Sequence, residues 1–245
     1  MKNISLRLVI LPLLIVSCTT DAIDNIESID SKISNKKSAK SARLMQNMAP
    51  ENPANIYDFS GKLHNDILDA YLSGNYQCNT IGQISQQIEV IGAQNNDLML
   101  LTTGTNFPPN LVVIQEIINN PQYKLDQTIL NSTMTIAAKD CLSNFMNNMV
   151  LWENDSYEEI YQYIISFETA VVANQAFNSE DKKVILTTSS IARYSTYYDP
   201  ERKDKDWDTS TGHRVAGLSG AIDDPCTAIK RSLVTGIMIH NQVTE

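Results

Sequence analysis

The sequence predicts a single all-α domain of six to seven helices behind a flexible N-terminal tether. In at least four segments apolar residues recur at spacings of three and four, whereas the alternation typical of strands is scarce. Only 9 glycines and 8 prolines occur in 245 residues, which disfavours a turn-dense sandwich or barrel. No repeat of fixed period is visible, so a solenoid is not expected.

The first helices are predicted from apolar faces. One face repeats every fourth residue and ends near Gly74: Phe59, Leu63, Ile67 and Tyr71. A second helix is expected over about Thr80 to Ile91, where isoleucines gather on one side. The apolar run Asp97–Thr103 is compatible with a strand or a helix, because periodicity cannot decide for so short a segment.

Prolines indicate where the central helices begin and end. Pro108 and Pro109 stand before or at the first turn of a helix over Leu111–Asn119, where proline is tolerated, and Pro121 is expected to end it. A long helical stretch from about Leu125 to Trp152 is predicted next.

Capping signals predict the remaining helices. Ser156 and Glu159 have the spacing of a capping box and precede an apolar stripe with helical spacing. Ser179 is the expected cap of the next helix, since acidic residues follow it in the first turn. Asp224 and Pro225 are expected to be the N-cap and first position of the last helix.

Residues 1–17 have the three parts of a secretory signal. Lys2 and Arg7 supply positive charge, and the apolar run Leu8–Val16 is too short to cross a bilayer as a helix. The sequence Ile15-Val16-Ser17-Cys18 resembles the lipobox of bacterial lipoproteins. This resemblance implies that Cys18 is acylated, for example with palmitate, and becomes the new N-terminus. Asp does not follow Cys18, so the resemblance favours a lipoprotein of the outer membrane, periplasmic or surface-exposed.

The segment 18–55 is expected to be a flexible tether, and residues 56–245 the helical domain. The tether is rich in Ser, Asn, Asp and Lys, lacks aromatic residues and ends in Pro50 and Pro53. Such a composition buries too little apolar surface to offset the entropy of ordering. The domain is long enough for a single core.

The chain is acidic, which excludes nucleic acid as the expected partner. It has 19 Lys+Arg and 28 Asp+Glu, a net charge of −9. Removal of residues 1–17 takes away Lys2 and Arg7 and leaves 17 basic against 28 acidic residues, a charge of −11. A chain of this charge repels phosphate backbones and anionic headgroups.

With Cys18 acylated, three cysteines remain, so at most one internal disulfide is possible. If a pair forms, we expect Cys78 with Cys226, because Cys141 lies in a helical stretch and is expected to be buried. No CxxC motif is present, so neither a redox site nor a zinc knuckle is expected.

No catalytic motif is recognisable, and we expect no catalytic residue and no cofactor. His64 lies in the first helix without a partner at helical metal-ligand spacing. His213 is expected in a loop, and His240 lies near the C-terminus. An enzyme remains possible, because catalytic groups assemble from distant positions.

An acidic segment near residue 206 is the only weak metal candidate. Asp204, Asp206 and Asp208 alternate along the chain, as oxygen ligands do in calcium loops. Thr209 stands where an EF-hand loop needs Gly, so a solvated connecting loop is the alternative. Trp207 is a candidate contact for a protein interface or a sugar face.

Two short motifs carry a resemblance. The first is N-P-x4-D-x2-G-x2-H-N, from Asn52 to Asn65, and the second is S-I-A-R-Y-S, from Ser190 to Ser195. Together they resemble an uncharacterised group of short lipoproteins and exported proteins from Bacteroidetes. His64 and Arg193 are candidate binding residues; they fix helix packing through hydrogen bonds, or Arg193 is an exposed ligand contact.

The sequence thus favours a membrane-anchored, non-enzymatic binding protein of the cell envelope. Its expected partners are the membrane, through the lipid, and an envelope protein or glycan. The alternatives are an envelope hydrolase with an unrecognised active site and a toxin-like or immunity-type protein.

Overall fold

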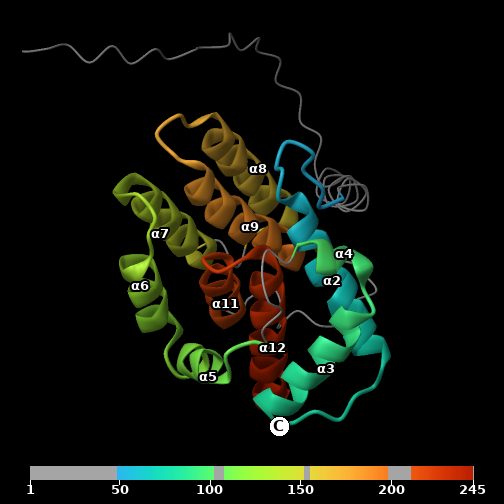
Figure 1. Cartoon of the computed structure of the whole chain (residues 1–245). Helices are drawn as coiled ribbons and strands as arrows, with labels where there is room; N and C mark the ends of the chain where they lie inside the picture. Colours follow the sequence, from blue (N-terminus) through green and yellow to red (C-terminus); the bar gives the residue numbers. More distant parts are fainter. Residues whose placement is uncertain (1–48, 102–107, 152–154, 198–210, 245) are drawn as a thin grey trace, which may run out of the picture. The chain divides into compact units, whose positions relative to one another are not determined.

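The computed structural model describes residues 49–101, 108–151, 155–197 and 211–244 (Figure 1). Within these ranges the chain forms ten helices and no strand, which confirms the predicted all-α class. The helices are α2 Asp58–Ser73, α3 Ile81–Ala93, α4 Asn96–Leu100, α5 Leu111–Asn119, α6 Pro121–Asn131, α7 Ile136–Leu151, α8 Tyr157–Ala173, α9 Ser179–Thr196, α11 Thr211–Ala221 and α12 Pro225–Thr244.

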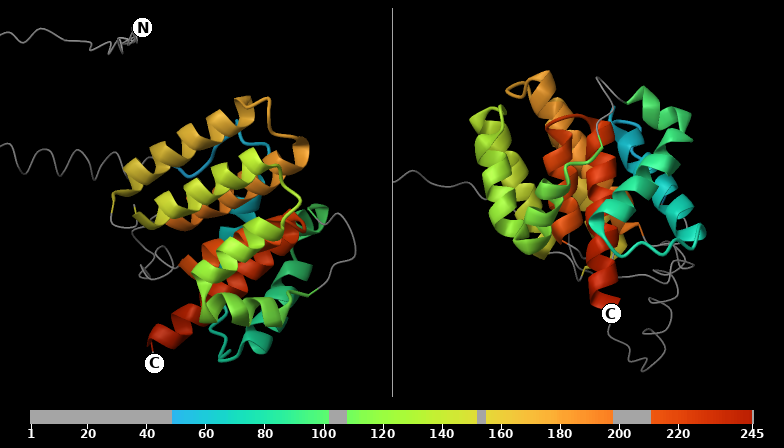
Figure 2. Two further views of the ribbon diagram at one scale, coloured as in Figure 1. Left: turned by 90° about the vertical axis from the view of Figure 1, so that its left-hand side faces the viewer. Right: turned by 60° about the horizontal axis from the view of Figure 1, so that its bottom comes forward.

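Helices α9 and α12 organise the domain. Helix α9 packs against α2, α7, α8, α11 and α12, and α12 also packs against α3 and α5 (Figures 1 and 2). Every residue from Val184 to Thr196 of α9 is buried, although many of them are Ser or Thr. Neighbouring helices therefore cover all sides of this part of α9.

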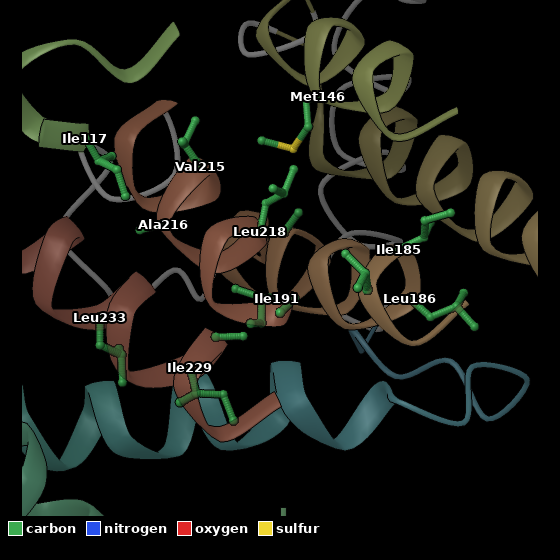
Figure 3. Packing of buried hydrophobic residues seen from close by; sticks show 14 of the residues in the cluster. Ile117, Met146, Ile185, Leu186, Ile191, Val215, Ala216, Leu218, Ile229 and Leu233 are labelled. Carbon is green, nitrogen blue, oxygen red and sulfur yellow. The ribbon is translucent and has the colours of Figure 1, made fainter. Parts of the chain in front are cut away.

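The apolar core is continuous from α9 to α11 and α12. Figure 3 shows Ile191 of α9, Leu218 of α11 and Ile229 of α12 in one cluster, together with Met146 of α7 and Ile117 of α5. All five side chains are almost completely buried. Burying side chains of this size contributes roughly 1.5–3 kcal/mol each, so this cluster supplies much of the stability.

Glycine allows α11 and α12 to approach closely. A Cβ added at Gly220 would meet the Cα of Ala228 at 2.5 Å and the carbonyl oxygen of Thr227 at 2.6 Å. Real Cβ atoms do not come so near to backbone, so a side chain at this position would push the two helices apart. The Gly/Ala-rich segment Ala216–Ala221 thus forms a helix contact.

The structure adds detail to the predicted helices. The run Asp97–Thr103, for which strand and helix were open, begins with the short helix α4. The long stretch expected from 125 to 152 is divided into α6 and α7. At the break, Asp181 of α9 accepts hydrogen bonds from the backbone N–H and the hydroxyl of Thr135. Helix α5 ends at Asn119, just before Pro121, as predicted, and Pro121 also opens α6 with Asn120 as its N-cap.

Two predicted helix starts are confirmed and a third moves by one residue. Ser156 and Glu159 form the reciprocal capping box of α8. Asp224 accepts hydrogen bonds from the N–H and hydroxyl of Thr227 at the start of α12. The cap of α9 is Asn178, not Ser179, and Asp181 completes a capping box there.

The expectation that His213 lies in a loop is wrong, because it belongs to α11. This helix escaped the sequence interpretation because its glycines and alanines give no strong apolar stripe. Together with α4 and the division of α6 from α7, it brings the helices of the described residues to ten, above the six to seven expected.

The domain also begins earlier than residue 56. Asn52 and Asn55, expected in the tether, are buried and bonded to helix α8. Residues 1–17, which are expected to form the signal, Cys18 and most of the expected tether lie outside the described residues.

No disulfide joins the three described cysteines, so the pair Cys78–Cys226, expected only if a disulfide forms, is not present. Cys141 is half-buried, and burial raises the pKa of its thiol. Among the described helices, none combines the length and apolar character needed to span a bilayer.

Candidate functional site

The two sequence motifs meet where α2 packs against α9. Gly61 makes this contact possible, because an added Cβ would lie 2.5 Å from the carbonyl oxygen of Ser190. The N–H of Gly61 donates to the Ser190 hydroxyl over 3.0 Å, and this hydroxyl donates to the carbonyl oxygen of Asp58 over 2.8 Å. The glycine and the serine of the two motifs are therefore direct partners.

A charge network forms the centre of the site. Arg193 of α9 is 0% exposed and lies between two carboxylates. Its Nη2 donates to Asp58 Oδ1 of α2 at 2.6 Å, and its Nε lies 3.3 Å from Glu168 Oε2 of α8. Burial alone would lower the pKa of Arg193. The charge of Glu168 and the hydrogen bond and charge of Asp58 outweigh burial and raise this pKa above its ordinary value.

Glu168 is also completely buried, and its oxygens accept several neutral hydrogen bonds. Asn52 Nδ2 donates to Oε2 at 2.5 Å, Asn55 Nδ2 donates to Oε1 at 2.9 Å, and the Ser189 hydroxyl donates to Oε1 at 2.8 Å. A buried carboxylate is stable only when its lone pairs are satisfied in this way. The same bonds fasten residues 52–55 to α8 and α9.

Asp58 links the network to an aromatic group. The Tyr194 hydroxyl donates to Asp58 Oδ2 at 3.2 Å, and the backbone N–H of Asn52 donates to Asp58 Oδ1 at 3.0 Å. Burial and then the charge of Asp58 raise the pKa of Tyr194, so the phenol stays protonated. The Asp58 side chain is 20% exposed, which makes it the edge of the network that reaches solvent.

His64 and Asn65 connect α2 to two other helices. His64 is 3% exposed, and its Nε2 lies 3.2 Å from the Ser232 hydroxyl of α12. Asn65 Nδ2 donates to the carbonyl oxygen of Tyr194 over 2.8 Å. His213 is buried as well, with Nε2 3.2 Å from the Ser195 hydroxyl, so it adds a contact between α11 and α9.

The arrangement can hold helices together, and it offers little surface to a ligand. The interpretation of Arg193 as an exposed ligand contact is wrong, because two carboxylates hold the guanidinium inside the domain. His64 likewise contacts neighbouring helices from a buried position. Both candidate binding residues thus belong to one network that connects α2, α8, α9 and α12.

Sequence reasoning missed Glu168, the group that completes this network. A signal was present: the carboxylate follows Phe167 within the apolar stripe of α8, where a lone charge is costly unless it is paired. Asn55, Ser189 and Ser232 carried no comparable signal, because isolated polar residues are common in helices and loops.

The other candidates from the sequence cannot be placed. Trp207 and the weak calcium candidates Asp204, Asp206 and Asp208 lie outside the described residues. Among the described residues, no group of three or more His, Cys, Asp or Glu side chains is suited to hold a metal ion. His240 of α12 lines a cavity of about 310 Å³ with Tyr71 and Cys78.

Comparisons of the chain with protein-family models, with curated proteins and with solved structures found no match.

Proposed function

We propose that the protein is a lipoprotein of the bacterial cell envelope, acylated at Cys18 and held at the outer membrane. Its helical domain acts as a non-enzymatic binding protein for an envelope protein or glycan. The lipobox-like sequence before Cys18 supports the anchor. The observation that carries the binding role is the burial of Arg193 between Asp58 and Glu168.

Because of this burial, the charged residues of the motifs serve to hold the fold together. Removing one partner from a buried ion pair costs about 3–5 kcal/mol, because the other charge is left uncompensated. Such a network fixes how α2, α8 and α9 pack. A rigid scaffold suits a binding protein, since less conformational freedom is lost when a partner docks.

The anchor is tested by metabolic labelling of producing cells with a tagged fatty acid. The wild-type chain and Cys141→Ala should incorporate the label and sediment with the outer membrane, whereas Cys18→Ala should do neither. Cys141→Ala is the matched control, because it also removes one thiol. Labelling of Cys18→Ala at the wild-type level contradicts the anchor.

The binding role is tested with the full-length chain incubated with envelope extracts. We expect capture of one defined protein or glycan, retained after high-salt washing and competed by excess unlabelled protein. Turnover of ester, glycoside or peptide substrates by the purified chain, abolished in Asp58→Asn, would contradict the non-enzymatic role and favour a hydrolase.

A further inference from the structure

A cavity of about 370 Å³ opens where four helices meet. The residues that line it lie outside both sequence motifs. Its lining residues come from α5, α6, α11 and α12 and the residues at their ends. Figure 1 shows these four helices on one side of the domain. Its volume lies at the lower end of the range for small-molecule sites, so it has room for a ligand of one ring rather than for a polymer segment.

The polar lining includes amide, hydroxyl and charged groups that can bond to a hydroxyl, among them Asn110, Gln127, Asn131, Ser219, Asp223 and Arg231. A sugar hydroxyl donates one hydrogen bond and accepts others, so it suits side-chain amides and carboxylate–guanidinium pairs. Val113 and Ile222 add apolar surface against which the C–H face of a sugar ring can pack.

Arg231 is held in position before any ligand arrives. Its side chain is 8% exposed, Nη1 donates to the Ser219 hydroxyl at 2.9 Å, and Nη2 donates to Asp223 Oδ2 at 2.9 Å. The Asp223 side chain is 56% exposed, so its carboxylate can be reached from the solvent. Side chains that are already fixed lose less entropy when they bind.

Each charged residue of the lining has a partner of opposite charge, which favours a neutral ligand over an anion. Asp223 pairs with Arg231, and Lys124 of α6 pairs with Glu116 of α5, which lies outside the lining. The chain as a whole carries −9, so its field also opposes the approach of anions.

We propose that this cavity binds a neutral monosaccharide unit. The inference deepens the proposed binding function and rests on it, because it selects a glycan or sugar as the ligand. Gln127 and Asn131 of α6 and the Asp223–Arg231 pair bond to the ring hydroxyls, while Val113 and Ile222 contact the ring.

The test uses the full-length chain purified in detergent and titrated by calorimetry with glucose, galactose, mannose and N-acetylglucosamine, each as free sugar and as methyl glycoside. Inorganic phosphate is the anion probe. Gln127→Ala removes one amide from the lining, and Asp223→Asn removes the carboxylate charge. Gln122→Ala is the matched control, because Gln122 lies on the same helix, is exposed and bonds to Asp126.

We expect saturable binding of at least one sugar, with a Kd raised fivefold or more in Gln127→Ala and Asp223→Asn and unchanged in Gln122→Ala. Equal affinity for the methyl glycoside identifies the end of a glycan as the source, and preference for the free sugar identifies a free monosaccharide. No sugar binding, equal binding by all variants, or binding of phosphate alone overturns the proposal. Capture of an envelope protein that persists in Gln127→Ala would leave the binding role in place while the sugar site failed.

Discussion

Two tight helix contacts in this domain are built by opposite means. Where α2 and α8 meet α9, one guanidinium, two carboxylates and a set of amides and hydroxyls fill the interface. Where α11 meets α12, the backbones approach at Gly220 and apolar side chains surround the contact. The first contact depends on a buried cation held between two carboxylates, and the second depends on the absence of a side chain.

The difference predicts how each contact fails. A charge network loses most when one partner is removed, because the remaining charge stays buried. A backbone contact loses most when an atom is added, because neither helix can move without disturbing the core.

The largest effect is expected from Glu168→Ala. The variant leaves Arg193 with one carboxylate and frees the Asn52 and Asn55 amides, so the free energy of unfolding should fall by about 3–5 kcal/mol. Urea unfolding followed by circular dichroism measures this change. Glu158→Ala, at the start of the same helix, is the control and should stay within about 0.5 kcal/mol of wild type. Similar losses in both variants would show that the network does not hold the interface.

Gly220→Ala should have the next largest effect. Its Cβ would meet Ala228 at 2.5 Å, and overpacking of this kind costs about 1–3 kcal/mol. Gly217→Ala on the same helix is the matched control, because its Cβ would find its nearest neighbours at an ordinary 3.7 Å. The control should be neutral or stabilising by up to about 1 kcal/mol, since alanine favours the helix. Thermal unfolding separates the two, and equal behaviour would contradict the close approach of α11 and α12.

Tyr157, beside the charge network, predicts a response to alkaline pH. Burial, followed by the nearby Tyr161, raises the pKa of Tyr157 above the ordinary value of 10.0. A folded-state pKa that is raised means that the folded chain holds the proton more tightly. Stability from this group is therefore complete below pH 10 and falls as the pH rises further.

Tyr157→Phe should make the loss of stability above pH 10 less steep. At neutral pH the variant should be stabilised by up to about 1 kcal/mol, because the Tyr157 hydroxyl is buried and has no hydrogen-bond partner among the described residues. Unfolding at a series of pH values measures both effects. An unchanged slope would indicate that Tyr157 ionises as easily in the folded chain as in the unfolded chain.

The smallest effect is expected from an exposed ion pair. Lys62 lies 2.5 Å from Asp66 on α2, but the two side chains are 50% and 43% exposed. Lys62→Ala should change the free energy of unfolding by no more than about 0.5 kcal/mol, because water already solvates both charges. A loss of stability as large as that of Glu168→Ala would contradict the expectation that buried ion pairs contribute more to stability than exposed pairs.

The sequence predicted the helices that have strong local signals. The capping box at Ser156 and the stripe around Ile164 depend on neighbours within a few residues, and both were found. Helix α11 was missed because its glycines serve a distant partner, α12. Periodicity reports on one side of a helix, so it does not reveal that Val184–Thr196 of α9 is buried on all sides.

The site was predicted only in part, for a similar reason. The motifs singled out Asp58, His64 and Arg193, and the structure brings their elements together. Glu168 lies outside both motifs, 25 residues before Arg193. Its role depends on how α8 packs against α9, and no local sequence pattern indicates that packing. The cavity that Arg231 lines likewise arises from two pairs of helices, α5–α6 and α11–α12, that are remote from each other in sequence.

The hydrogen bonds of Asn52 and Asn55 have a mechanical consequence. A force applied to the chain at residue 49 reaches Glu168 and the α8–α9 pair through these amides before it reaches the first turn of α2. Tension is then carried by several buried bonds in parallel, rather than by a helix end that peels away one turn at a time. A domain attached through its N-terminal side, as proposed, would thereby resist being pulled open by motion of the surface that holds it.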